Sequence, residues 1–285
     1  MMKILSGKKV AESIFEKTLQ KIQLLDESPR LLSVIIGDNP AAVSYARAKG
    51  RKAGALGAEF KVLDFSATLS QREIERQIRA EIKSWDPDGI ILEKPVPDKF
   101  DFDRLVSLIP PVADIDCQRL DNLGRLMAGK PKYFPATPKA VVEILKFYEI
   151  PPEGKHITIV GRSLTVGLPL SVMLLSKSEM GNATVTVCHS RTPDISKHTR
   201  RADIVVLAAG KPGLLTADMV TKKAIVIDVG TTYVNGKLHG DADFEPVSQK
   251  VRAITPVPGG VGPVTTACLF QNLLDAALTK RKILG

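Results

Sequence analysis

The sequence decides its fold at His156-Ile157-Thr158-Ile159-Val160-Gly161-Arg162-Ser163-Leu164-Thr165-Val166-Gly167, where a short apolar run passes through a turn of small residues into the start of a helix. In such a turn, phosphate oxygens can approach backbone N–H groups at the positive end of the helix. The run departs from the G-x-G-x-x-G fingerprint, because Ser163 and Val166 occupy its second and third glycine positions. The stretch predicts a nucleotide-binding turn, and an ordinary strand-to-helix turn is the alternative.

The strand expected next, at 183–188, indicates the kind of nucleotide. NAD enzymes usually end this strand with an Asp or Glu that binds the ribose 2′-hydroxyl, whereas a 2′-phosphate requires Arg and hydroxyl donors. Here the strand runs into His189-Ser190-Arg191-Thr192, which contains no carboxylate. This favours NADP over NAD, with Arg162, Ser190 and Arg191 as phosphate donors. For Arg191 alone, a solvated loop charge is an equally good interpretation.

Strands and helices are expected to alternate in two series along the chain. The short apolar runs that indicate strands are 31–36, 60–65, 89–92, 157–160, 183–188, 204–207 and 225–228. Helical patterns occupy 6–25, 41–56, 70–85 and 138–149. Such alternation predicts parallel sheets, and the Pro- and Gly-rich segment 108–138 separates the series. We expect an α/β protein with domains at 1–137 and 138–264, the second of Rossmann type, and a C-terminal helix, 265–285, that returns to the first domain.

Composition excludes several classes of function. The chain has 40 Lys and Arg against 31 Asp and Glu, a net charge of +9, but these residues are scattered, aromatic residues make up 5%, and no nucleic-acid-binding motif occurs. No apolar run reaches the roughly 18 residues of a membrane span, and the first residues lack a signal peptide's apolar region. The three cysteines have no metal-ligand spacing. We expect a cytoplasmic protein that binds no nucleic acid, membrane or metal.

A tyrosine and a lysine share one face of the helix expected at 41–56. Tyr45 and Lys49 are four residues apart, and Ser44 stands beside the tyrosine. A lysine in a cleft can relay protons, and a tyrosine ring can cover a flat heterocycle. By spacing alone, a surface pair on a helix is the commoner explanation.

Five segments occur along the chain in a characteristic order. They are Ser44-Tyr45-Ala46-Arg47-Ala48-Lys49, Asp88-Gly89-Ile90-Ile91-Leu92-Glu93-Lys94-Pro95-Val96-Pro97, Asp114-Ile115-Asp116, Gly161-Arg162-Ser163-Leu164-Thr165-Val166-Gly167-Leu168-Pro169 and Pro256-Val257-Pro258-Gly259-Gly260-Val261-Gly262-Pro263-Val264-Thr265. Together they resemble the bifunctional methylenetetrahydrofolate dehydrogenase/cyclohydrolase family, and the proline-glycine run is the most specific of them. With weaker matches between them, the resemblance covers nearly the whole chain.

The resemblance implies a role for each matching residue. Tyr45 would stack on the folate beside Ser44, Lys49 would transfer protons in the cyclohydrolase step, and Asp116 would bind the pterin. The folate would also border Gly262 and Pro263, in a cleft between a three-layer α/β folate domain and a Rossmann-type NADP domain. Members of the family usually form homodimers through their nucleotide domains. The residues expected to bind the cofactor are Gly161, Arg162, Ser163, Val166, Gly167, His189, Ser190, Arg191, Gly230 and Thr231.

The chain departs from the family pattern at several positions, most of them in the folate segments. Glu93 and Lys94 stand where the family usually has Gln and an apolar residue, Ala113 and Cys117 replace a Lys and a Gly, and Leu168 replaces a Lys. A carboxylate within about 4–6 Å of a lysine favours its ammonium form, and an ammonium is a poor general base. We include Glu93 among the catalytic residues. Its charge would weaken the cyclohydrolase step and spare hydride transfer, unless Lys94 or another residue neutralises that charge.

The resemblance implies NADP-dependent oxidation of 5,10-methylenetetrahydrofolate to 5,10-methenyltetrahydrofolate, followed by hydrolysis to 10-formyltetrahydrofolate. A dehydrogenase with weakened cyclohydrolase is the first alternative. Two others remain open: a different NADP oxidoreductase on the same two-domain plan, and a folate- or nucleotide-binding paralogue without turnover.

Overall fold

The computed structural model describes residues 3–284 and divides into two compact units. The first, here the six-stranded unit, consists of the N-terminal residues through Ser13 together with Pro135–Cys268. The second, the three-stranded unit, consists of Ile14–Phe134 and the residues from Leu269 onward. No helix in the described part of the chain is long and apolar enough to cross a membrane.

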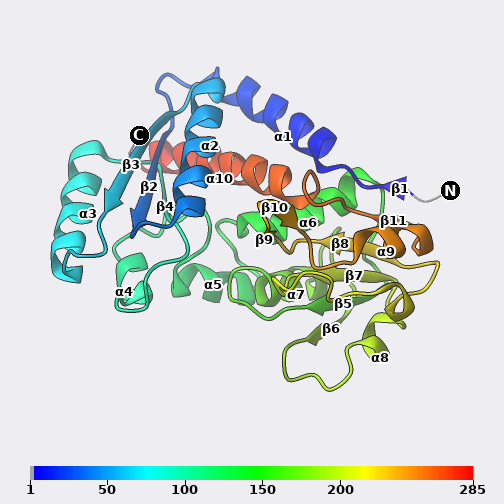
Figure 1. The fold of residues 1–285 in the computed structure, drawn as a ribbon. Helices are drawn as coiled ribbons and strands as arrows, with labels where there is room; N and C mark the ends of the chain where they lie inside the picture. Colours follow the sequence, from blue (N-terminus) through cyan, green and yellow to red (C-terminus); the bar gives the residue numbers. More distant parts are fainter. Residues whose placement is uncertain (1–2, 285) are drawn as a thin grey trace. The chain divides into compact units, whose positions relative to one another are not determined.

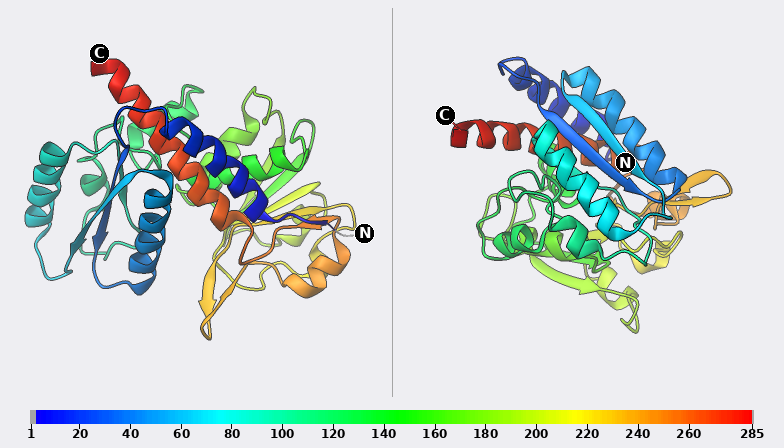
Figure 2. Two further views of the ribbon diagram at one scale, coloured as in Figure 1. Left: turned by 90° about the horizontal axis from the view of Figure 1, so that it is seen from above. Right: turned by 90° about the vertical axis from the view of Figure 1, so that its left-hand side faces the viewer.

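The three-stranded unit is built on a parallel sheet in the order β3-β2-β4 (Figure 1). Its strands are β2 (Arg30–Ile36), β3 (Glu59–Phe65) and β4 (Gly89–Leu92), and its helices include α2 (Pro40–Leu56), α3 (Gln71–Trp85), α4 (Phe102–Val106) and α5 (Leu120–Met127). α2 and α3 lie on opposite sides of the sheet (Figures 1 and 2). This confirms the expected three-layer α/β arrangement.

Alternation along β2 assigns its side chains to the two faces of that sheet. Val34 packs in the cluster that contains Ile74 and Ile78 of α3. Ile35 packs instead against Ala42 and Ala46 of α2. Both faces are therefore buried, which explains why β2 is an uninterrupted apolar run apart from one serine.

The six-stranded unit contains a parallel sheet in the order β1-β11-β8-β7-β5-β6. The strands are β1 (Lys3–Ile4), β5 (His156–Val160), β6 (Thr184–Cys188), β7 (Ile204–Leu207), β8 (Ile225–Asp228) and β11 (Ala253–Ile254). β5 pairs with β6 on one side and β7 on the other, so the strand order reverses there, as it does at the ligand crevice of open α/β sheets. The Rossmann-type architecture is confirmed.

Helices and a hairpin complete this unit. They are α6 (Ala136–Phe147), α7 (Gly167–Leu175), α8 (Ser196–Thr199), the 3-10 helix η1 (Ala217–Met219), the hairpin strands β9 (Thr232–Val234) and β10 (Lys237–His239), and α9 (Phe244–Lys250). The hairpin projects away from the sheet (Figure 2). α1 (Gly7–Ile22) and α10 (Val261–Leu284) each contribute residues to both units, and within the three-stranded unit the rings of Phe15 and Phe270 lie 6.4 Å apart.

The sequence predicts a first domain that begins at residue 1, whereas in the structure the described residues before Ile14 belong to the six-stranded unit. β1 pairs with β11, and the Tyr148 hydroxyl donates to the Ser6 carbonyl at 3.0 Å. Gly7 lies so close to the Gly260 carbonyl that a Cβ at Gly7 would overlap it. Pairing between segments far apart in sequence, rather than local pattern, makes these residues part of that unit.

All three cysteines are free and buried. Burial raises the pKa of Cys188, and it raises the pKa of Cys268 to about 12. The thiols of the six-stranded unit are therefore held in their protonated, unreactive form.

The loop between α4 and α5 is organised by one buried carboxylate. Asp114 accepts hydrogen bonds from the backbone N–H groups of Gln118 and Arg119 and from the Asn122 amide, at 2.8–3.0 Å. Burial raises the pKa of Asp114, and these donors oppose the rise. Inside this loop Cys117 takes φ +51°, the left-handed region, at a position where the resembled family usually has glycine.

We predict that Cys117→Gly is more stable than Cys117→Ala by about 1 kcal/mol, because glycine removes the left-handed penalty that alanine keeps. Free energies of unfolding from urea titrations measure the difference. The control is Ala80, an exposed residue of α3. There, the change from alanine to glycine should lower the free energy of unfolding by about 1 kcal/mol. A glycine variant less stable than the alanine variant at position 117 would contradict the prediction.

Candidate functional site

The turn after β5 is shaped by two glycines. Gly161 takes φ +133°, and a Cβ there would overlap the Ala208 carbonyl oxygen. A Cβ at Gly167, the first residue of α7, would overlap the Gly161 carbonyl oxygen. Ser163 Oγ accepts a hydrogen bond from the Val166 N–H at 3.1 Å and so holds the turn between them. The close-packing role of the fingerprint's third glycine thus falls to Gly167, one residue later than the motif places it.

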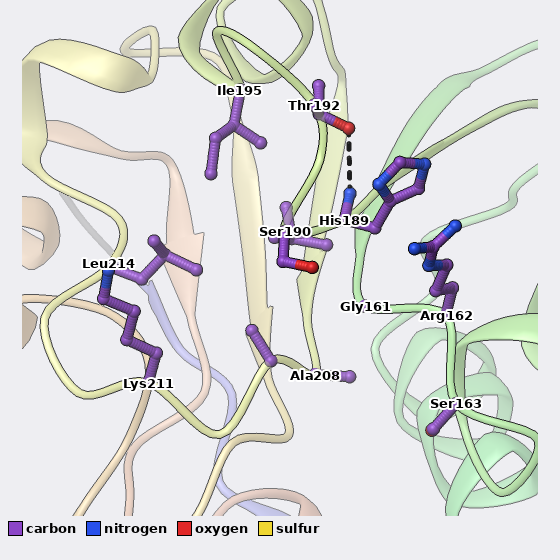
Figure 3. A pocket seen from close by; sticks show the side chains of 12 residues that line it. Gly161, Arg162, Ser163, His189, Ser190, Thr192, Ile195, Ala208, Lys211 and Leu214 are labelled. Carbon is purple, nitrogen blue, oxygen red and sulfur yellow. Dashed lines mark hydrogen bonds between the residues drawn. The ribbon is translucent and has the colours of Figure 1, made fainter.

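A cavity of about 470 Å³ opens at this turn (Figure 3). Its lining comes from the carboxyl ends of β5, β6 and β7 and from the segments that follow them, the crevice where open α/β sheets bind ligands. The lining residues are Val160, Gly161, Arg162, Ser163, His189, Ser190, Thr192, Ile195, Ala208, Ala209, Lys211 and Leu214.

The charge of the cavity suits an anion. Arg162 and Lys211 lie on opposite sides of Ser190 (Figure 3), and among the described residues that line the cavity none carries a carboxylate. Arg191, the other predicted phosphate donor, is exposed and is not part of this lining. Its backbone N–H donates to His189 Nδ1 at 3.1 Å. Two cations and a hydroxyl without a competing acid can hold a phosphate group.

Lys211 is a functional candidate that the sequence analysis missed. It follows β7 in a loop whose three backbone N–H groups, those of Ala209, Gly210 and Lys211, donate to the Asp241 carboxylate at 2.7–3.1 Å. Asp241 is fully buried. The signal in the sequence, a lysine one residue after a turn glycine, is too common to identify a binding residue, because the aspartate that positions the loop is 30 residues away.

A second buried carboxylate connects this loop with the end of β8. Asp228 accepts hydrogen bonds from the N–H groups of Gly230, Asp241 and Ala242 at 2.8–3.1 Å. Burial raises the pKa of Asp228 to about 6, and the charge of Asp241 contributes to the rise. Gly230 and Thr231, both predicted to bind the cofactor, follow Asp228 after one residue and lie outside the cavity lining.

The remaining candidates in the six-stranded unit belong to helix ends. Val166 and Gly167 form the start of α7, where the helix dipole favours an anion. Gly262 and Pro263 form the first turn of α10. Their predicted contacts with cofactor and folate stay predictions.

The three-stranded unit brings Lys49 and Glu93 together. Lys49 Nζ donates to both carboxylate oxygens of Glu93, at 2.7 Å to Oε1 and 2.6 Å to Oε2. The lysine projects from α2, and the glutamate follows β4, where its N–H donates to the Val34 carbonyl of β2. Only 17% of the Lys49 side chain and 7% of the Glu93 side chain are exposed. The pair is therefore largely removed from water, and its contact is stronger than that of a surface salt bridge.

Lys94 does not take part in that ion pair. Its ammonium lies 4.2 Å from the ring centroid of Phe102 in α4. Burial lowers the pKa of Lys94, and the charges of Asp116 and Asp103 oppose this effect. The charge of Glu93 is thus compensated by Lys49, whereas Lys94 belongs to the surroundings of Asp116.

The other predicted folate residues lie in the same unit. Tyr45 is 48% exposed, one helical turn before Lys49, and Ser44 beside it is exposed. Asp116 is half-buried in the loop that Asp114 organises. Gln118 of this loop pairs with both the N–H and the carbonyl of Leu92, at 3.0 and 2.8 Å. This pairing ties the Asp116 loop to the strand end that carries Glu93.

Comparison with known proteins gives consistent matches along the chain. The catalytic-domain model of tetrahydrofolate dehydrogenase/cyclohydrolase matches residues 5–116, and the model of its NAD(P)-binding domain matches residues 135–281. A bifunctional protein FolD of Caldanaerobacter subterraneus subsp. tengcongensis is 41% identical over 273 residues, 96% of each chain.

Solved structures agree with these matches. The crystal structure of a bifunctional 5,10-methylenetetrahydrofolate dehydrogenase/cyclohydrolase from Thermoplasma acidophilum has a TM-score of 0.91 at 41% identity, covering 98% of this chain and 100% of that one. A FolD structure from Trypanosoma brucei, complexed with NADP cofactor and inhibitor, has a TM-score of 0.92 at 34% identity, covering 100% of this chain and 99% of that one.

The raised pKa of Asp228 predicts a pH-dependent contribution to stability. The folded state holds the Asp228 proton up to about pH 6, whereas an unfolded aspartate loses it near 3.8. The stabilisation is complete below the unfolded pKa and is lost as the pH rises through the folded pKa. Its upper limit is about 3 kcal/mol.

We therefore expect the free energy of unfolding of the unchanged chain, minus that of Asp228→Asn, to fall between about pH 4 and pH 7. Urea titrations at several pH values measure it. A difference that stays constant over this range would contradict a raised pKa.

Proposed function

Because this chain belongs to the tetrahydrofolate dehydrogenase/cyclohydrolase family, we propose that it oxidises 5,10-methylenetetrahydrofolate to 5,10-methenyltetrahydrofolate with NADP and hydrolyses the product to 10-formyltetrahydrofolate. Identity at the level of 41% over nearly the whole chain supports both activities. The observation that carries the proposal is that one chain holds a glycine turn with a cationic cavity in its six-stranded unit and Lys49, Tyr45 and Asp116 in its three-stranded unit.

The six-stranded unit fits a phosphorylated dinucleotide. Gly161 and Gly167 let the turn pack closely against neighbouring backbone carbonyls, and this turn leads into the start of α7, where backbone N–H groups can bind phosphate oxygens. Arg162 and Lys211 supply positive charge in the adjoining cavity. When bound, the cofactor supplies the nicotinamide that accepts the hydride, and the protein contributes binding and orientation.

The two reactions make different demands on the protein. Hydride removal from the methylene carbon is assisted by the lone pair of a folate nitrogen and requires no protein acid or base. Hydrolysis requires a proton to leave the attacking water and another to reach the departing nitrogen. Lys49 is the residue we assign to this proton traffic, with Tyr45 stacking on the folate and Asp116 binding the pterin.

The Lys49–Glu93 pair sets the balance between these reactions. Lys49 contacts both oxygens of the carboxylate, so an amide at position 93 would place an NH₂ donor against the ammonium in either orientation. A carboxylate therefore suits this geometry better than glutamine, and it holds Lys49 as the ammonium. We infer a bifunctional enzyme whose cyclohydrolase is weak relative to its dehydrogenase.

Glu93→Gln is predicted to raise the ratio of cyclohydrolase to dehydrogenase rate by about tenfold, because the freed amine can act as a general base. Purified protein, methylenetetrahydrofolate and either NADP or NAD are mixed, and reduced cofactor and methenyl product are followed separately. Glu75→Gln, which removes another buried carboxylate of the same unit, one paired with Arg104, is the control and should leave the ratio unchanged.

An unchanged ratio in Glu93→Gln would remove the inhibitory role of Glu93. The same assays on the unchanged chain test whether it has the proposed activity. Folate and nucleotide binding without formation of reduced cofactor would identify a paralogue without turnover, and failure to bind folate would point to a different NADP oxidoreductase.

Preference for NADP over NAD rests on the cationic cavity. We predict that Lys211→Gln and Arg162→Gln each weaken binding of 2′,5′-ADP by about tenfold, as expected for loss of one charge-assisted hydrogen bond, and leave 5′-ADP binding within about twofold. Isothermal titration calorimetry measures both affinities. Lys222→Gln, an exposed lysine outside the cavity, is the control. Equal losses for both nucleotides would argue against a 2′-phosphate subsite.

We also propose a cytoplasmic homodimer formed through the six-stranded unit, as the family resemblance implies. Leu168 and Leu175 support this assignment, because they are exposed on one face of α7, seven residues apart.

A further inference from the structure

Ser33 is the only polar residue between Leu31 and Ile36 in β2, and it is fully buried. It shares the α2 face of the sheet with Ile35, because both are odd-numbered positions of the strand. A hydroxyl in such a place costs free energy unless it is hydrogen-bonded. Ser33 lies outside the five segments that resemble the family.

The hydroxyl is bonded to the glutamate of the ion pair. Ser33 Oγ donates to Glu93 Oε1 at 2.6 Å, the oxygen that also accepts from Lys49 at 2.7 Å. The other oxygen, Oε2, accepts from Lys49 at 2.6 Å. Glu93 is 6% exposed, and its carboxylate accepts hydrogen bonds from the side chains of Ser33 and Lys49. Glu93 Oε1 thus accepts from two donors, Ser33 of β2 and Lys49 of α2.

Two proton arrangements are open to a buried amine and carboxyl in contact. Either the proton stays on Lys49, giving an ammonium and a carboxylate, or it moves to Glu93, giving an amine and a carboxylic acid. Both arrangements contain the same number of protons. A hydroxyl donor stabilises the carboxylate more than the neutral acid, because hydrogen bonds to ionised acceptors are roughly twice as strong. Ser33 therefore favours the first arrangement.

We propose that Ser33 is a positioning residue that keeps the proton on Lys49 by holding Glu93 as an oriented carboxylate. It also fixes the carboxylate plane, since without it the group can rotate away from its two-oxygen contact with the ammonium. In the reaction, Ser33 determines how much free amine is available for hydrolysis. This consequence rests on the proposed function, whereas the charge state of Lys49 can be measured without substrate.

The test compares Ser33→Ala, Ser33→Thr and Glu93→Gln with the unchanged chain. Brief acylation with acetic anhydride, which modifies free amines, is followed at Lys49 by peptide mass spectrometry, with Lys61 as internal reference because Glu81 pairs with it in the same unit. Thr18→Ala is the matched control, since it removes a buried hydroxyl that is bonded to the Ile14 carbonyl and not to Glu93. The cyclohydrolase-to-dehydrogenase ratio is measured on the same proteins.

We expect Ser33→Ala to raise both Lys49 acylation and the rate ratio about three- to tenfold, with Ser33→Thr, which keeps a hydroxyl, within twofold of the unchanged chain. In the Glu93→Gln background, Ser33→Ala should have no further effect, because no carboxylate remains to be held. A purely structural role would affect stability but not this coupling.

Three results would overturn the proposal: unchanged acylation in Ser33→Ala, the same change in Thr18→Ala, or equal effects of Ser33→Ala with and without Glu93. Absence of dehydrogenase activity in the unchanged chain would refute the proposed function instead. The acylation result would still decide the role of Ser33.

Discussion

The close approach of backbone to backbone at the end of β5 constrains everything built on the larger sheet. Gly161 lies against the Ala208 carbonyl, and Gly167 lies against the Gly161 carbonyl. A side chain at Gly161 would have to displace the Ala208 carbonyl after β7, and one at Gly167 would have to displace the Gly161 carbonyl within the turn. The turn, the orientation of Arg162 and the shape of the neighbouring cavity follow from these two contacts.

Strand and helix order could be predicted because both sheets are parallel and buried, so that each strand is a short apolar run. Local pattern was insufficient where pairing alone makes a strand. β1 has two residues, and it becomes part of the larger sheet only through β11, about 250 positions later in the chain. The start of α10 could not be predicted either, because its first residues, Val261–Pro263, belong to the proline-glycine run, which is not a helical pattern.

The candidate sites were predictable where a motif carries the residue and not where a distant partner positions it. Lys49 and Glu93 came from recognisable segments, and their contact is direct. Ser33 reads as a mere interruption of an apolar strand, and Lys211 as a surface lysine, until their partners 60 and 30 residues away are known. Buried carboxylates recur in this pattern: Asp228 and Asp241 gather backbone N–H groups at the ends of β8 and β7, from donors as far as 14 and 32 residues away. Such long-range donor sets satisfy buried charge but leave no periodic trace in the sequence.

The distribution of the cysteines has a practical consequence for observing this molecule. Cys117 lies in the three-stranded unit, whereas Cys188 and Cys268 lie in the six-stranded unit, and all three are buried in the folded chain. A maleimide dye therefore marks only chains in which the corresponding unit has opened. Mapping the label to a cysteine of one unit or the other separates the local opening of the two units in the purified protein, without engineered probes.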